Sequence, residues 1–194
     1  VFLLHGTLTD EEMAGLYTHP KIKALINISH GEGFGLPLFE AAHHGLPVIT
    51  TNWGGQVDFL NAPKKDKKTK KVRRRPHFAS VEYDIQPIQP GAVWDPVLIR
   101  ESMWCFPKML SYKTKLRQVF KNYSFYLSQA KKLKTHVEKT LEEQGQFDKF
   151  ADTVSAGEDL KNVEYVFVSD FFAQELQGGA ELSLQTLIDS CPSD

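Results

Sequence analysis

Cysteine is scarce in this sequence of 194 residues, which holds only Cys105 and Cys191. The two lie far apart and lack the spacing of metal ligands, so we expect a reducing compartment, the cytoplasm, rather than a secreted disulfide scaffold. Long apolar runs are also missing, since no stretch approaches the ~18 residues of a membrane span. No signal peptide is evident, and the chain opens on the apolar run 1–4 instead of an initiating methionine. We therefore expect a segment of something longer.

An excess of charge of one sign is lacking as well. Lys and Arg number 23 against 24 Asp and Glu, which leaves a net charge of −1. The overall charge therefore implies no polyanionic partner. The hydrophobic content of 41% is that of a soluble globular protein with one good core, or one domain plus a fragment.

One segment departs from this balance. Residues 61–78 hold nine basic residues and one acid between Lys64 and Arg75, without apolar periodicity. This composition predicts an exposed, mobile loop. Two interpretations stay open: a solvated insertion, or attraction to an anionic surface such as lipid headgroups or an acceptor, which would place the protein peripherally at a membrane. No nucleic acid partner is expected, because the segment has no interleaved aromatics on which bases could stack.

Strands and helices are expected to alternate over the first part of the chain. The apolar run 24–29 predicts a buried parallel strand, 37–44 a helix opened by Pro37, and 47–51 the next strand. This alternation predicts an α/β fold, a Rossmann-like parallel sheet flanked by helices. Within residues 1–60 we also expect a strand at 1–4, a helix capped by Thr9 with Glu12, and a short helix after Gly55. Further along the chain we expect a strand at 79–85 and an extended stretch at 86–91. Residues 94–150 should be mostly helical, with an apolar stripe from Leu116 to Leu133.

Glu32 and Glu40 are the most informative pair of residues, and they bracket a glycine-rich loop where a strand feeds a helix. Backbone N–H groups at such a helix start favour an anion, and Gly33 and Gly35 allow a phosphate to approach the backbone. Carboxylates suit hydroxyl groups, which donate hydrogen bonds to them. A ligand that combines a diphosphate with hydroxyls on either side is a nucleotide-activated sugar.

Residues 1–60 resemble the donor-binding half of a family-4-like retaining glycosyltransferase with two Rossmann-type domains, the GT-B architecture. The resemblance rests on the seven-residue gap between the glutamates and on motifs in the expected order: Glu32-Gly33-Phe34-Gly35-Leu36-Pro37, Phe39-Glu40-Ala41-Ala42, Gly45-Leu46-Pro47-Val48-Ile49 and Asn52-Trp53-Gly54-Gly55. It implies a hexosyltransferase that moves a sugar from a nucleotide donor, UDP- or GDP-linked, to an acceptor hydroxyl with retention of configuration. No cofactor and no metal are implied, and the acceptor is not identified.

The resemblance also implies roles for individual residues. Glu32, the catalytic residue, would contact the sugar hydroxyls, and Glu40 the ribose. The backbone of Gly33, Phe34, Gly35 and Leu36 would contact sugar or phosphate. Further loop contacts are expected from His30, Gly54, Gly55, Gly178 and Gly179. For His30 packing of the loop is favoured over a ligand contact, and for Gly178-Gly179 an ordinary turn is the less favoured alternative. For Trp94, Trp104 and Phe106 a role in a helix-covering core is favoured over stacking on a ligand.

Two domains are expected, a donor-binding domain over 1–155 and a strand-loop-helix segment over 160–194 that resembles the start of the acceptor-side domain of the same family. Either the longer protein carries tandem transferases, or residues 163–190 pack back on this domain. No residues align with the earlier part of the family's donor domain, which supplies an Arg and a Lys to the diphosphate. A non-catalytic module that binds nucleotide sugars, or a fragment without turnover, therefore remains the alternative function, and an adaptor for lipid surfaces is a third.

Overall fold

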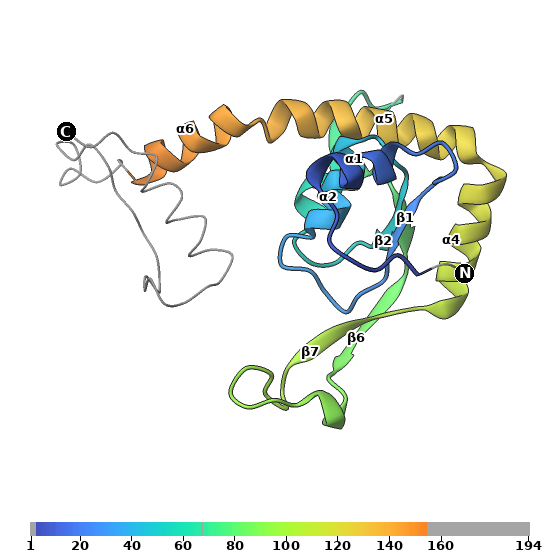
Figure 1. The fold of residues 1–194 in the computed structure, drawn as a ribbon. Helices are drawn as coiled ribbons and strands as arrows, with labels where there is room; N and C mark the ends of the chain where they lie inside the picture. The colour runs from blue at the N-terminus through green and yellow to red at the C-terminus, as the bar shows by residue number, and fades with distance from the viewer. Residues whose placement is uncertain (1–2, 67, 155–194) are drawn as a thin grey trace. The chain divides into compact units, whose positions relative to one another are not determined.

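The computed structural model describes residues 3–66 and 68–154, which are drawn in colour in Figure 1. The chain divides into two compact units, Val1–Glu142 and Glu143–Asp194, and each is described by itself. The described part of the second unit is the helix α6 (Glu143–Val154). The expected strand-loop-helix segment at 160–194, with Gly178 and Gly179, lies outside the described residues.

A three-stranded parallel sheet forms the centre of the first unit. Its strands are β1 (Leu25–Asn27), β2 (Val48–Thr51) and β5 (Ala79–Val81), in the order β1-β2-β5. All four residues of β2 are buried, as expected for the middle of a parallel sheet. The prediction of a mixed α/β fold around a parallel sheet is confirmed.

Full burial of β1 was the wrong expectation. Among the described residues β1 pairs only with β2, so it is an edge strand, and Ile26 is 41% exposed. An apolar run shows that a strand can be buried, but the neighbouring elements decide whether it is. The expected strand at 1–4 is also absent from its described part, because Leu3 and Leu4 lie exposed outside any strand.

Helices cover the sheet as the sequence predicts. The helix α1 (Asp10–Thr18) begins with the expected capping box, in which Thr9 and Glu12 satisfy each other's backbone N–H groups. The helix α2 (Leu36–His43) has Pro37 in its first turn, and Gly45, whose φ is +73°, lies just past its C-cap His44. The short helix α3 (Val57–Leu60) follows β2. The main core cluster includes Tyr17, Leu38, Ala41, Ala42, Val48, Phe59, Leu60, Leu133 and Val137.

The basic segment is a β-hairpin, which corrects the expected mobile loop. The strands β3 (Asn61–Lys65) and β4 (Val72–Pro76) pair antiparallel over five residue pairs. Ala62 is buried in the main core cluster and anchors the base of the hairpin. The sequence hides this hairpin because most of its side chains face water, so the strands show no alternation of apolar and polar residues.

A second hairpin replaces part of the expected helical region. The strands β6 (Tyr83–Pro87) and β7 (Met103–Pro107) pair antiparallel, and the 3-10 helix η1 (Pro90–Ala92) lies between them. They extend as an arm from the sheet in Figure 1. The expected strand at 79–85 is therefore split at Glu82 into β5 and β6, which have different partners. Trp94 is 67% exposed, so its expected core role is wrong, while Trp104 and Phe106 lie half-buried on β7.

Two helices follow the arm, α4 (Met109–Lys121) and α5 (Tyr123–Thr140), with a break at Asn122. The expected single apolar stripe is only partly correct. Val119, Ala130 and Leu133 are buried, but Phe120 is 85% exposed because the break at Asn122 changes the direction of the chain. None of the helices among the described residues is both long and apolar enough to cross a bilayer.

Candidate functional site

Two glycine-containing loops meet at one edge of the parallel sheet. Residues 28–35 follow β1 and residues 52–56 follow β2, so parallel pairing brings both loops to the carboxyl ends of the strands. The backbone N–H of Gly55 donates a hydrogen bond of 2.9 Å to the carbonyl oxygen of Glu32. A Cβ atom on Gly55 would lie 1.7 Å from the carbonyl oxygen of Gly33. The two loops are therefore in direct backbone contact, and only glycine fits at position 55.

Gly54 and Gln56 complete this junction. Gly54 has a φ of +94°, a conformation that favours glycine, and a Cβ there would lie 2.7 Å from Oε1 of Gln56. Gln56 is 1% exposed, and its Nε2 donates to the carbonyl oxygen of Thr51 at 3.4 Å. Its Oε1 is buried and has no hydrogen-bond partner within the described part of the chain. The sequence does not single out Gln56, because nothing in the local pattern distinguishes a buried amide from an exposed one.

The Glu32 carboxylate is held by two side chains from the end of β1. Its Oε1 accepts hydrogen bonds from Nδ2 of Asn27 at 2.7 Å and from Oγ of Ser29 at 3.0 Å. Oδ1 of Asn27 in turn accepts from the backbone N–H of Ser29 at 2.9 Å. Over residues 3–66 and 68–154, no group donates to Oε2 of Glu32. The carboxylate is thus fixed through one oxygen, and the other is available to a ligand.

A run of backbone amides lies beside Glu32. For the N–H groups of Gly33, Phe34, Gly35 and Leu36, no acceptor occurs among the residues that the structure describes. Gly35 has a φ of +86° and caps α2 without a side chain, and Pro37 has no N–H of its own. The residues Gly33, Phe34 and Leu36 are exposed. Successive unpaired N–H groups at a helix start favour an anion, because their dipoles add to that of the helix.

Glu40 is directed toward α1. Its Oε2 accepts a hydrogen bond of 2.8 Å from the hydroxyl group of Tyr17, which is 6% exposed. Burial raises the pKa of Tyr17, and the hydrogen bond to Glu40 and the negative charge of Glu40 raise it further. Tyr17 therefore stays a proton donor and fixes one oxygen of the carboxylate. The sequence does not indicate this contact, because Tyr17 and Glu40 lie on different helices.

His30 packs against β7. Its Nδ1 lies 2.7 Å from the carbonyl oxygen of Cys105, which can only accept, so Nδ1 carries the proton. The ring stacks on Trp104 with 4.7 Å between centroids and lies 4.7 Å from the ring of Phe106. The backbone N–H of Cys105 donates to the carbonyl oxygen of His30 at 3.2 Å. These contacts join the arm formed by β6 and β7 to the loop that carries Glu32, a link that the sequence pattern does not indicate.

His43 and His44 are adjacent at the end of α2. His43 is exposed and His44 half-buried, as expected for neighbours on a helix, and their rings meet edge to face. Burial lowers the pKa of His44, and the charge of His43 lowers it further. Within the described ranges, no three His, Cys, Asp or Glu side chains cluster as metal ligands would.

Two groups of curated proteins match parts of the chain. The serotype-specific mannosyltransferase WbdA of Escherichia coli is 57% identical over 42 residues, which are 22% of this chain and 5% of that protein. The sucrose-phosphate synthase of Zea mays is 47% identical over 51 residues, which are 26% of this chain and 4% of that protein. Both relatives are glycosyltransferases, so these segments show a glycosyltransferase-like relationship. No family model and no solved structure matches the chain.

Proposed function

We propose that this chain contains the donor-binding part of a retaining, family-4-like hexosyltransferase with the GT-B architecture. Such an enzyme transfers a sugar from a nucleotide donor to an acceptor hydroxyl in carbohydrate biosynthesis. One observation carries the proposal: four backbone amides without acceptors, from Gly33 to Leu36, lie beside a glutamate whose carboxylate is fixed through one oxygen. The local similarity to two glycosyltransferases supports it.

The amides would bind the diphosphate of the donor. The N–H groups of Gly33, Phe34, Gly35 and Leu36 stand at the start of α2, where the helix dipole adds a positive potential. Negative charge on the diphosphate grows as the bond to the sugar breaks. Preorganised N–H donors stabilise that charge without reorganisation, which lowers the barrier. No metal ion and no cofactor is part of this proposal, and the donor would be UDP- or GDP-linked.

Glu32 would bind the sugar and contribute to catalysis. Because Asn27 and Ser29 occupy Oε1, the second oxygen can accept from sugar hydroxyl groups without the carboxylate rotating away. Gly54 and Gly55 act indirectly, since they lock this loop against the loop after β2. His30 holds the same loop from the side of β7.

Glu40 would bind the ribose of the nucleotide. Tyr17 occupies Oε2, so Oε1 is the oxygen that would accept from a ribose hydroxyl. Hydrogen bonds to a charged acceptor contribute about 1.5–3 kcal/mol.

The alternative, a module that binds nucleotide sugars without turnover, rests on a different observation. Neither loop, residues 28–36 or residues 52–56, contains a lysine or an arginine to neutralise a diphosphate. Amides alone suffice for binding, but cations strengthen the stabilisation of a leaving group. A transfer assay on a longer protein that contains this segment separates the two functions, because only the enzyme releases the nucleoside diphosphate with time.

Calorimetry with nucleoside diphosphates and nucleotide sugars tests the residue roles. We expect Glu40→Gln to weaken binding of both ligands at least tenfold, because the charged acceptor for the ribose is lost. Glu32→Gln should spare the plain nucleotide and weaken the nucleotide sugar. The control is Glu138→Gln, an exposed glutamate on α5 whose only described ion pair joins it to Lys134. Unchanged affinity in a folded Glu40→Gln variant would refute the ribose role, and equal losses for both ligands in Glu32→Gln would refute the sugar role.

A further inference from the structure

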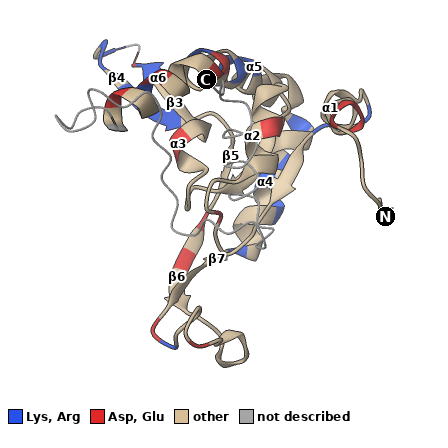
Figure 2. Cartoon of the chain, turned by 60° about the vertical axis from the view of Figure 1, so that its left-hand side comes forward, with Lys and Arg blue, Asp and Glu red and all other residues tan. Residues whose placement is uncertain are grey.

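The hairpin of β3 and β4 presents basic side chains on one face. Its register places Lys64 opposite Arg73 and Ala62 opposite Arg75. Because alternate residues of a strand face the same side, Lys64, Arg73 and Arg75 share the face that begins at the buried Ala62. Figure 2 shows the concentration of lysine and arginine at β3 and β4. Like charges directly opposite each other destabilise a strand pair, so this arrangement opposes folding of the hairpin.

The described residues offer little negative charge to the hairpin, since Arg75 interacts electrostatically with Asp66 but no ion pair forms. Asp66 is the single acid of residues 61–78, and its Oδ1 accepts from the backbone N–H groups of Lys68 at 2.8 Å and Thr69 at 2.7 Å. In the part of the chain that the structure describes, no lysine or arginine of β3 or β4 forms an ion pair. Burial is the main cause of the lowered pKa of the neighbouring His77, and the charges of Lys64 and Lys132 contribute.

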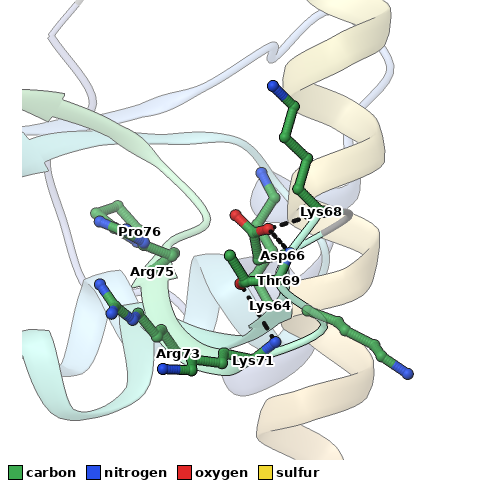
Figure 3. A pocket seen from close by; sticks show the side chains of 9 residues that line it. Lys64, Asp66, Lys68, Thr69, Lys71, Arg73, Arg75 and Pro76 are labelled. Atoms are coloured by element: carbon green, nitrogen blue, oxygen red, sulfur yellow. Dashed lines mark hydrogen bonds between the residues drawn. The ribbon is translucent and has the colours of Figure 1, made fainter.

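The basic face lines an open hollow. Its volume is about 840 Å³, within the range of about 300–1,000 Å³ that small-molecule sites occupy. Figure 3 shows Arg73 and Arg75 extending from the same side of β4, with the turn that holds Asp66 and Thr69 across from them. Six cationic residues contribute to the lining: Lys64, Lys65, Lys68, Lys71, Arg73 and Arg75.

We propose that this hollow binds the phosphate groups of a phosphorylated ligand. The guanidinium groups of Arg73 and Arg75 can each donate two parallel hydrogen bonds to a phosphate, and the ammonium groups of Lys64 and Lys71 supply further charge. The bound anion would remove the repulsion between Lys64 and Arg73. The ligand is either a soluble phosphorylated molecule or the phosphate of a lipid headgroup. The proposal is independent of the donor site formed by residues 28–36.

A titration of the isotope-labelled full chain with inorganic pyrophosphate, followed by two-dimensional NMR, tests the site and locates it. We expect saturable shifts of the backbone amides of β3 and β4. The double variant Lys64→Gln with Arg73→Gln should bind at least tenfold more weakly at the hairpin. The matched control is Lys113→Gln with Arg117→Gln, which removes the same charges from exposed positions on α4. The control should keep the native affinity.

Thermal unfolding provides a second readout. Without ligand, the hairpin variant should be as stable as the native chain or more stable, because the opposed charges are gone. Pyrophosphate should raise the melting temperature of the native chain and of the control, and raise it less in the hairpin variant. If the variant unfolds before it can be titrated, the native chain still tests the proposal. A native chain that gains no stability from pyrophosphate would contradict it.

Vesicle sedimentation identifies the source of the phosphate. The source is a lipid headgroup, and the site stands, if the chain co-sediments with phosphatidylglycerol vesicles but not with phosphatidylcholine vesicles. Pyrophosphate should then release the chain from the phosphatidylglycerol vesicles. If pyrophosphate binds at the hairpin and the chain co-sediments with neither kind of vesicle, the site stands and the ligand is a soluble phosphorylated molecule. The proposal is overturned if pyrophosphate shifts the amide signals of residues 31–36 only, or if the hairpin variant binds pyrophosphate as tightly as the control does. It is also overturned if the chain co-sediments with vesicles while pyrophosphate neither binds the hairpin nor competes with the vesicles.

Discussion

Replacing Gly55 with alanine tests whether the two loops at the edge of the sheet act as one unit. A Cβ at this position would lie 1.7 Å from the carbonyl oxygen and 2.7 Å from the carbonyl carbon of Gly33, and 3.2 Å from Cα of Phe34. All three neighbours are backbone atoms, so no side chain can rotate away. Real contacts of this kind do not fall below 3.0 Å, so the loops must separate by more than about 1 Å.

This separation should affect both stability and binding. It lengthens the hydrogen bond between the N–H of Gly55 and the carbonyl oxygen of Glu32, a bond that contributes about 0.5–1.5 kcal/mol. For a chain of this size, 1 kcal/mol corresponds to about 2–4 °C in melting temperature. The displaced amides of residues 33–36 would no longer match the diphosphate. We therefore expect the affinity for a nucleoside diphosphate to fall at least tenfold, which is about 1.4 kcal/mol.

Calorimetry and thermal unfolding of Gly55→Ala measure the two effects. Gly31→Ala is the control, because it adds the same methyl group to the neighbouring loop after β1, where the nearest atom is Nε1 of Trp53 at 3.9 Å. We expect the control to stay within about 0.5 kcal/mol of the native chain. Native affinity together with an unchanged melting temperature in Gly55→Ala would show that the contact between the loops has no role.

Three further predictions concern other parts of the molecule. Tyr17→Phe removes the hydrogen-bond donor to Glu40, so we expect denaturant titration to show a loss of about 0.5–1.5 kcal/mol in stability, together with weaker nucleotide binding. A variant equal to the native chain in both assays would exclude a positioning role. Burial is the main cause of the lowered pKa of His77, so the unfolded chain binds a proton there more readily than the folded chain, and the melting temperature should fall as the pH drops below about 6.5. His77→Gln should reduce that fall, and an unchanged dependence of melting temperature on pH would contradict this. The chelator EDTA should leave nucleotide binding intact, and a strict requirement for magnesium or manganese would overturn the proposed site.

Much of the central fold could be predicted from the sequence, because its signals are local. The capping box at Thr9, the proline at the start of α2 and the glycine after its end each fix the backbone within a few residues. The apolar runs that became β1 and β2 are short and separated by a helix, which leaves a parallel crossover as the simple connection. The position of the loop with Glu32 at the carboxyl end of β1 followed from this order.

The strand pairing of the two hairpins could not be predicted in this way, although the sequence did predict extended backbone over β6. Strand pairing joins residues that are distant along the chain, and a strand that faces water on both sides shows no apolar alternation. The sequence of the basic segment therefore predicts a loop, whereas the structure pairs Lys64 with Arg73 in a hairpin. The residues of β7 looked like part of a helical region because their apolar content alone does not distinguish a short strand from a helix.

The side chains that support the candidate site were decided by tertiary structure for the same reason. The sequence by itself determined that Glu32 and Glu40 flank a glycine-rich turn between a strand and a helix. It did not determine that Tyr17 would donate to Glu40, because α1 must first pack against α2. It did not determine that Gly55 would contact Gly33, because that contact depends on the pairing of β1 with β2. Local chemistry sets which residues can take part, whereas long-range packing sets which of them meet.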